Sequence, residues 1–130
     1  MKIVEVAVGV IKRGDMIFVS QRGESLHQGG KWEFPGGKRE TDESIEQALC
    51  RELLEEINIQ VRNQQPLMVI EHDYGDKKVR LDVRIVEDFA GEPCHQENQQ
   101  ACWVAINELH NYEFPAANKP IVEALQALIG

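Results

Sequence analysis

Three glutamates lie close together in the sequence, at a spacing that gathers them on one side of a helix. Glu52, Glu55 and Glu56 fall within an arc about 100° wide when each residue advances by about 100°. Like charges three or four residues apart repel, and Arg51 can offset only part of their charge and that of Glu43. The spacing therefore predicts a site for a hard divalent cation. Mg²⁺ or Mn²⁺ is expected, because the sequence has no His or Cys cluster that would favour Zn²⁺.

A glycine pair immediately upstream adds bare backbone to these acids. Pro35-Gly36-Gly37 would let a carbonyl or an amide approach a metal or a phosphate closely. The ordinary alternative for a Glu-x-x-Glu-Glu run is a solvated acidic helix without chemistry. Six glycine and charged residues at fixed spacing arise by chance with a probability of about 10⁻⁵, so solvation alone does not explain the pattern. An acidic site repels anions, so activity on a phosphate would depend wholly on metal.

A helix must carry the glutamates. Apolar side chains recur every fourth residue from Ile45 to Ile57, which predicts a helix beginning after Ser44. We expect Thr41 or Asp42 to cap its start, and Asn58 to end it in the left-handed conformation. The apolar stripe lies about a quarter turn from the acids, so the glutamates should border the core rather than point straight into solvent.

Strands are expected on both sides of this helix. The ranges 4–11 and 16–20 predict a hairpin, and a loop should cover 21–31. A short strand is predicted at 32–34, where Pro35-Gly36-Gly37 ends it. Two further strands are predicted at 66–72 and 79–86, joined by a turn at 74–76, and another at 101–106. Asn107 should cap a short helical turn, and a terminal helix is expected at 118–129 with Pro120 in its first turn. This order predicts an α/β (α+β) protein, in which helices pack on a mixed sheet.

Length and charge exclude several classes of protein. A chain of 130 residues suits one domain, since chains divide only beyond about 250 residues. The net charge of −8 disfavours binding to a nucleic-acid polymer, which needs clustered cations. Most of this charge is local, because the range 33–56 holds eight carboxylates and three cations, a charge of −5.

The sequence also predicts the compartment. No apolar run approaches the roughly 18 residues that a membrane helix needs. Glu5 interrupts the N-terminus where a signal peptide would be continuously apolar. Three cysteines without a C-x-x-C spacing suit reduced thiols. We therefore expect an unprocessed cytoplasmic chain that does not bind membranes. A monomer is the expected state, although nothing in the sequence fixes the number of subunits.

The spaced residues resemble the signature of the Nudix hydrolase family. Gly37, five residues, Glu43, seven residues and Arg51-Glu52-Leu53-Leu54-Glu55-Glu56-Ile57-Asn58-Ile59 match G-x5-E-x7-R-E-U-x-E-E-x-G-U, where U is aliphatic. Asn58 departs from the pattern by replacing a glycine. Asn tolerates the left-handed conformation next best, so we expect a small cost in stability and little change in chemistry. The resemblance implies one Nudix domain over 1–130, with the signature at 37–59 and a mixed β-sheet sandwiched between helices.

Other segments are similar to the MutT branch of this family, which hydrolyses 8-oxo-dGTP. They are Ala7-Val8-Gly9, the range 32–38, Gly91-Glu92-Pro93 and the range 114–120. The last range lies where MutT proteins recognise the base. The resemblance implies a Mg²⁺-dependent hydrolase that converts 8-oxo-dGTP, and dGTP more weakly, to the monophosphate and pyrophosphate. Attack of water at the β-phosphorus is the pattern of that branch, and the activity would keep a mutagenic nucleotide out of replicating DNA.

The resemblance also implies roles for the catalytic and metal-binding residues. Glu52, Glu55 and Glu56 would bind the metal together with a backbone carbonyl of Gly36 or Gly37. Arg51 would orient the glutamates, and Glu43 would either bind metal or hold Arg51. Glu97 matches a further carboxylate that contacts metal or helps to activate water. Glutamates this close titrate as a group, so the sequence does not single out one of them as the general base.

The substrate-binding residues implied by the resemblance are more scattered. Asn118 would hydrogen-bond the base edge, although it could simply cap the last helix, and Phe34 would line the base pocket or belong to the core. Arg22 and His27 would contact phosphate or sugar, and Lys77 stands where the branch has an arginine. The full set is Arg22, His27, Glu33, Phe34, Pro35, Gly36, Lys77 and Asn118. The histidines His27, His72, His95 and His110 are each expected at the surface when considered alone.

Two other functions stay open. The nearer is a Nudix hydrolase of CTP, of related pyrimidine triphosphates or of a nucleoside diphosphate derivative, and the range 114–120 is the feature that separates it from the MutT branch. The farther is a non-catalytic Nudix ligand-binding module, whose usual sign is the loss of the signature glutamates. Those glutamates are intact here.

Overall fold

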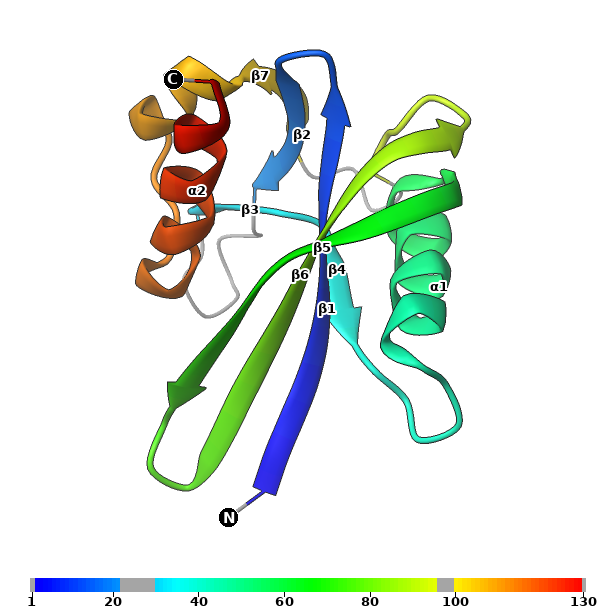
Figure 1. Ribbon diagram of the computed structural model, residues 1–130, viewed down its shortest axis with the longest axis vertical. Coiled ribbons are helices and arrows are strands. Elements are labelled where there is room, and N and C mark those ends of the chain that lie inside the picture. The colour runs from blue at the N-terminus through cyan, green and yellow to red at the C-terminus, as the bar shows by residue number, and fades with distance from the viewer. Residues whose placement is uncertain (1, 22–29, 96–99, 130) are drawn as a thin grey trace.

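The computed structural model describes residues 2–21, 30–95 and 100–129 (Figure 1). Four strands precede the first helix, three follow it, and the remaining helices come last among the described residues. In order, the elements are β1 (Lys2–Arg13), β2 (Met16–Gln21), β3 (Trp32–Glu33), β4 (Gly36–Lys38), α1 (Ile45–Ile57), β5 (Gln60–Asp73), β6 (Lys77–Ala90), β7 (Ala101–Ala105), the 3₁₀ helices η1 (Ile106–Asn111) and η2 (Ala116–Asn118), and α2 (Lys119–Ile129).

The described strands form one mixed sheet with β1 at its centre. The order β3-β2-β1-β6-β5 runs across the sheet, while β4 pairs with β1 and β7 pairs with β2. β1 is parallel to β6, so that Val6 lies opposite Leu81, and it is antiparallel to β2 and β4. The predicted mixed sheet is therefore confirmed.

Helices cover the sheet on both faces, with α1 on one side and α2 on the other (Figure 1). Side chains of β1 alternate, so Ala7 and Ile11 join the cluster under α1 whereas Val8 and Val10 join the cluster under α2. The helices contribute Ala48, Leu49, Leu53 and Ile57 to the first cluster, and Ile121, Val122 and Leu125 to the second. Each fully buried Leu or Ile stabilises this arrangement by about 1.5–3 kcal/mol relative to an exposed one. None of the helices in the described part of the chain is long and apolar enough to cross a membrane.

The helix α1 matches the prediction in its range but not in its cap. Ser44, rather than Thr41 or Asp42, caps the start, because its hydroxyl accepts from the backbone N–H of Gln47 at 3.1 Å. The Gln47 side chain in turn accepts from the N–H of Ser44 at 2.8 Å, which completes a capping box. Asn58 ends the helix at φ 60° and ψ 38°, so the predicted left-handed end is confirmed.

Several other element predictions need correction. Pro35-Gly36-Gly37 does end β3, but Gly36 and Gly37 also begin β4, because their backbone pairs with Val8 and Ala7. β5 begins at Gln60, six residues before the predicted start, through a polar stretch with irregular register. Asn107 does not cap η1, whose first flanking residue is Ala105 without a side-chain cap. The last α-helix begins at Lys119, after the separate turn η2.

Candidate active site

The three glutamates of α1 lie at the edge of the buried stripe, as their spacing predicts. The side chains of Glu52 and Glu56 are 19% and 22% exposed, whereas that of Glu55 is 59% exposed. The buried residues Leu53 and Ile57 hold the same helix against the sheet. Two carboxylates are therefore partly removed from water, and the third stays at the surface.

The glycines of β4 let the backbone come close to both the helix and the central strand. A Cβ on Gly37 would overlap the carboxylate of Glu52, and a Cβ on Gly36 would overlap the carbonyl oxygen of Ala7. Gly36 also has a φ of 153°, which favours glycine. Glycine at position 37 therefore allows Glu52 to lie directly against β4, and glycine at position 36 allows β4 to lie close to β1.

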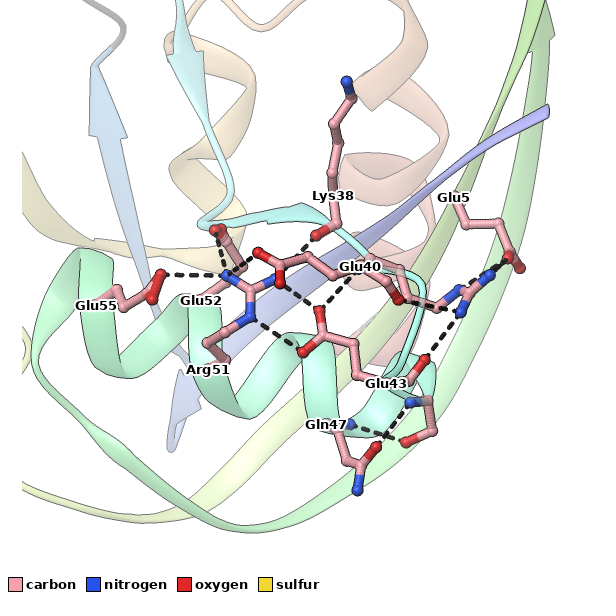
Figure 2. A network of polar contacts seen from close by, with 10 residues as sticks. Glu5, Lys38, Glu40, Glu43, Gln47, Arg51, Glu52 and Glu55 are labelled. Carbon is pink, nitrogen blue, oxygen red and sulfur yellow. Dashed lines mark hydrogen bonds and ion pairs between the residues drawn. The ribbon is translucent and has the colours of Figure 1, made fainter. Parts of the chain in front are cut away.

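Arg51 gathers the carboxylates around one guanidinium (Figure 2). Its Nε and Nη2 donate to Oε2 and Oε1 of Glu43 at 3.0 and 2.6 Å, which is a bidentate pair. Nη1 donates to Oε1 of Glu55 at 3.1 Å and lies 3.5 Å from Oε1 of Glu52. Nη2 also donates to the carbonyl of Lys38 at 3.0 Å, which ties α1 to β4. Arg51 thus lies among the glutamates that the sequence expects it to orient, and its role there stays a prediction.

The network shifts the pKa values of Glu43 and Glu52 in opposite directions. The hydrogen bond from Arg51, followed by that from the backbone of Glu40, lowers the pKa of Glu43 to about 2. The same pairing with Glu43 raises the pKa of Arg51, so the pair stays ionised. Burial raises the pKa of Glu52, against the opposing effect of Arg51 and with a further increase from Glu55. Because burial disfavours the ionised form of Glu52, a second cation beside it would stabilise its negative charge.

A cavity of about 290 Å³ opens beside these residues and joins the glutamate helix to the C-terminal segment. Its walls are mostly apolar, with charged or amide groups at a few points. Lining it are Val6, Val8, Glu33, Phe34, Gly36, Gly37, Lys38, Glu56, Leu81, Pro115 and Asn118. Four of the predicted substrate-binding residues, Glu33, Phe34, Gly36 and Asn118, therefore meet the predicted metal ligand Glu56 around one space.

Two contacts bring the C-terminal segment to this cavity. The N–H of Trp32 donates to the carbonyl of Glu113 at 2.8 Å, and the rings of Phe34 and Phe114 stack with centroids 5.0 Å apart. Phe34 is buried, so it serves the core while it lines the cavity. Asn118 lies in η2, before the start of α2.

Some of the predicted site residues do not line this cavity. Lys77 is exposed at the start of β6, paired with Lys2, and it does not line the cavity. Pro35 is buried and does not line the cavity, and its carbonyl accepts from the N–H of Gly9 at 2.8 Å. Arg22, His27 and Glu97 lie outside the described residues.

The donor set suits a hard cation. Glu52, Glu55 and Glu56 supply carboxylate oxygens, and Gly36 and Gly37 of β4 supply backbone that carries no side chain next to Glu52. Within the described ranges, no three His, Cys, Asp or Glu side chains already converge as in a formed metal site. Glu52 and Glu55 both lie within 3.5 Å of Nη1 of Arg51.

Sequence reasoning missed one residue at this site. His95 was expected at the surface, but its side chain is only 4% exposed and its Nε2 lies 3.9 Å from Oε1 of Glu56. Its place in the segment that follows Gly91-Glu92-Pro93 was the available signal, because the resemblance assigns that segment a carboxylate near the metal. The burial itself depends on long-range packing that no local pattern reveals.

Comparisons with known proteins agree with this geometry. A family model described as a NUDIX domain matches residues 6–124. The 8-oxo-dGTP diphosphatase of Escherichia coli (strain K12) is 36% identical over 129 residues, 98% of this chain and 100% of that protein. The CTP pyrophosphohydrolase of the same organism is also 36% identical, over 98% of this chain and 95% of that protein.

Solved structures share the whole fold. A structure from a study of MutT from Aliivibrio salmonicida and Vibrio cholerae has a TM-score of 0.88 and 41% identity, and the match covers 98% of this chain and 99% of that one. The solution structure of the Escherichia coli ORF135 protein has a TM-score of 0.90 and 35% identity, with 100% and 93% covered. The predicted sheet between helices is confirmed by these likenesses, and with the matched domain and the intact glutamate signature they show that the chain belongs to the Nudix family.

Proposed function

We propose that this Nudix chain hydrolyses 8-oxo-dGTP, and dGTP more weakly, to the nucleoside monophosphate and pyrophosphate. One observation carries the proposal: Glu56 of the signature helix and Asn118 of the C-terminal segment line the same cavity. A phosphate chain held at the glutamates can therefore extend to a base held at η2. The similarity to 8-oxo-dGTP diphosphatases over nearly the full chain supports the same substrate.

The glutamates would hold the divalent ion that such a reaction needs. Glu52, Glu55 and Glu56 would bind it with a carbonyl of Gly36 or Gly37, and Glu97 would add a carboxylate. All of these donors are oxygens, which suits Mg²⁺ and also admits Mn²⁺. When bound, a divalent ion neutralises phosphate charge and makes a nearby water more acidic.

Arg51 would act as a positioning residue. Its bidentate pair with Glu43 fixes the guanidinium, which in turn fixes Glu52 and Glu55 relative to β4. Both oxygens of Glu43 are engaged by Arg51, and one of them also accepts from the N–H of Glu40 at 2.9 Å. Of the two roles expected for Glu43, these contacts support the one in which it holds Arg51.

The base would bind between apolar walls. Phe34, Leu81 and Pro115 supply nonpolar surface, and the amide of Asn118 offers both a donor and an acceptor. Oxidation of guanine converts N7 from an acceptor to a donor and adds a carbonyl at C8. A pocket whose polar group matches this edge disfavours unoxidised guanine, because burying a polar group without its partner is costly.

The proposed activity acts on free nucleotides in the cytoplasm rather than on DNA. The net charge of −8 repels a polyanion, while a metal at the glutamates would attract a single triphosphate. We propose that the enzyme works as a monomer and protects replication by removing an oxidised precursor.

A substrate panel tests this function. Hydrolysis would be measured with 8-oxo-dGTP, dGTP, CTP and ADP-ribose in Mg²⁺ and in excess chelator, by chromatographic separation of the nucleoside monophosphate products. The proposal expects the highest kcat/KM for 8-oxo-dGTP and no turnover in chelator. Full turnover in chelator, or no turnover of any triphosphate, would overturn it.

A second candidate is hydrolysis of CTP or a related pyrimidine triphosphate. The observation that favours it is the 36% identity to a CTP pyrophosphohydrolase, which equals the identity to the 8-oxo-dGTP diphosphatase of the same organism. The same glutamates would serve both reactions, so only the base pocket distinguishes them. A higher kcat/KM for CTP than for 8-oxo-dGTP in the panel would select this second function.

A further inference from the structure

The imidazole of His95 lies at the proposed metal site without a role in the function described above. Its Nε2 is 3.9 Å from Oε1 of Glu56, and its side chain is 96% buried. Glu56 is itself mostly buried and lines the cavity with Gly36 and Gly37. Because the side chain is buried, packing of the surrounding segments fixes its position beside Glu56.

The backbone explains this placement. The N–H of Cys94 donates to the carbonyl of Ile57 at 3.0 Å, so the segment after β6 is tied to the last turn of α1. Pro93, one residue earlier, is buried. His95 follows these two anchors directly, and Glu56 directly precedes Ile57. The two side chains therefore approach one another from segments that are fixed to each other.

The distance between Nε2 of His95 and Oε1 of Glu56 is compatible with both atoms binding one metal ion. At 3.9 Å, Nε2 and Oε1 are too far apart for a hydrogen bond. A nitrogen and an oxygen bound to the same divalent ion at about 2.0–2.2 Å each can be separated by up to about 4.3 Å. One ion can therefore contact both atoms without rearrangement of the backbone.

We propose that His95 is a nitrogen ligand of the divalent ion held by Glu56. This inference rests on the proposed function, because it assigns a further ligand to the same metal. It gives the site one imidazole among carboxylate and carbonyl oxygens. Imidazole suits Co²⁺ better than Mg²⁺, so this chain should bind Co²⁺ more tightly, relative to Mg²⁺, than an all-oxygen site would.

The direct test is pulsed electron paramagnetic resonance of Mn²⁺ bound to the full-length protein. Electron spin echo modulation from a coordinated ¹⁴N is expected, and growth with ¹⁵N-histidine should replace it by the ¹⁵N pattern. His95→Gln exchanges the imidazole for an amide whose oxygen can still bind metal, so the nitrogen modulation should vanish. His72→Gln is the matched control, because His72 lies against Tyr74 at the exposed end of β5 and should leave the signal intact.

Metal titration provides a second readout. By calorimetry, His95→Gln should weaken Co²⁺ binding by at least about tenfold and Mg²⁺ binding by much less. Equal weakening of both metals would overturn the assignment, as would nitrogen modulation that persists in His95→Gln. If His95→Gln fails to fold, absence of ¹⁵N modulation from the labelled wild-type protein still overturns it.

The outcomes separate this inference from the proposed function. Bound Mn²⁺ without nitrogen modulation, combined with normal hydrolysis of 8-oxo-dGTP, overturns the role of His95 alone. Bound Mn²⁺ with histidine modulation but no hydrolysis of any triphosphate overturns the proposed function and leaves His95 as a ligand. A protein that binds no divalent ion overturns both.

Discussion

Arg51 binds Glu43 through two parallel hydrogen bonds, from Nε to Oε2 at 3.0 Å and from Nη2 to Oε1 at 2.6 Å. The two residues lie eight positions apart, one before α1 and one inside it. Through this pair, the loop that follows β4 and the glutamate helix hold one guanidinium in a fixed plane. The carboxylates of Glu52 and Glu55 are then arranged around a group that cannot turn freely (Figure 2).

Replacing the planar guanidinium should therefore reduce activity without unfolding the protein. Arg51→Lys keeps the charge but cannot make the bidentate pair, so we expect kcat/KM to fall by about 10–100-fold. Arg62→Lys is the control, because Arg62 is exposed and lies at the surface in a 4.0 Å ion pair with Asp88. Steady-state kinetics and thermal unfolding of both variants check this prediction. Unchanged activity in Arg51→Lys would show that the planar contact has no positioning role.

The same pair should make stability depend on acid. The folded pKa of Glu43 is about 2, whereas an unfolded glutamate titrates near about 4.3. The unfolded state therefore takes up a proton first as the pH falls, so the stabilisation is present above about pH 4.3 and is lost progressively towards pH 2. Urea unfolding at pH 6, 4 and 3 should show a smaller pH dependence for Glu43→Gln. An identical pH dependence in both proteins would contradict the assigned pKa.

The close contact between β4 and α1 predicts a steric effect. Gly37→Ala places a methyl group on the carboxylate of Glu52, which must move away from the strand. We expect a loss of kcat/KM of at least about 100-fold, because a displacement of about 1 Å at a catalytic group can have that effect. Gly75→Ala is the control, since it lies in the β5–β6 turn with open space around it and should change stability only. Equal activities of the two variants would contradict the proposed role of this contact.

Asn58 provides a test of the one departure from the family signature. Asn58→Gly should stabilise the protein by up to about 1 kcal/mol, because glycine adopts φ 60° without steric cost. Asn58→Ala should destabilise it by about 1–2 kcal/mol for the opposite reason. Chemical denaturation measures both, and kcat should stay within about twofold of the wild type because the residue lies outside the cavity. A destabilised Asn58→Gly variant would show that the asparagine side chain contributes more than its conformation.

Local sequence patterns predicted those features of the site that lie within α1. The arc of Glu52, Glu55 and Glu56 follows from helical geometry, and the end at Asn58 follows from its tolerance of the left-handed conformation. The Ser44 cap was also readable, as a Ser-x-x-Gln capping box, but the earlier Thr41 and Asp42 competed with it.

Features that depend on distant partners could not be predicted in this way. Gly36 and Gly37 are strand residues only because β1 offers them an edge. β5 begins in a polar stretch because β6 pairs with it, although its residues lack the usual strand pattern. His95 is buried because the segment after β6 is tied to Ile57. These placements arise from tertiary contacts, which outweigh local propensity.

Base selection is the central claim of the proposed function, and the ratio of kcat/KM for 8-oxo-dGTP to that for dGTP measures it most directly. Wild-type protein in Mg²⁺ should favour 8-oxo-dGTP, and Glu56→Gln should reduce both rates together because it weakens the metal site that both substrates share. Asn118→Ala should lower the ratio by about tenfold or more, since the polar edge of the oxidised base then loses its partner. A wild-type ratio of one or below, or a ratio unchanged in Asn118→Ala, would contradict the account.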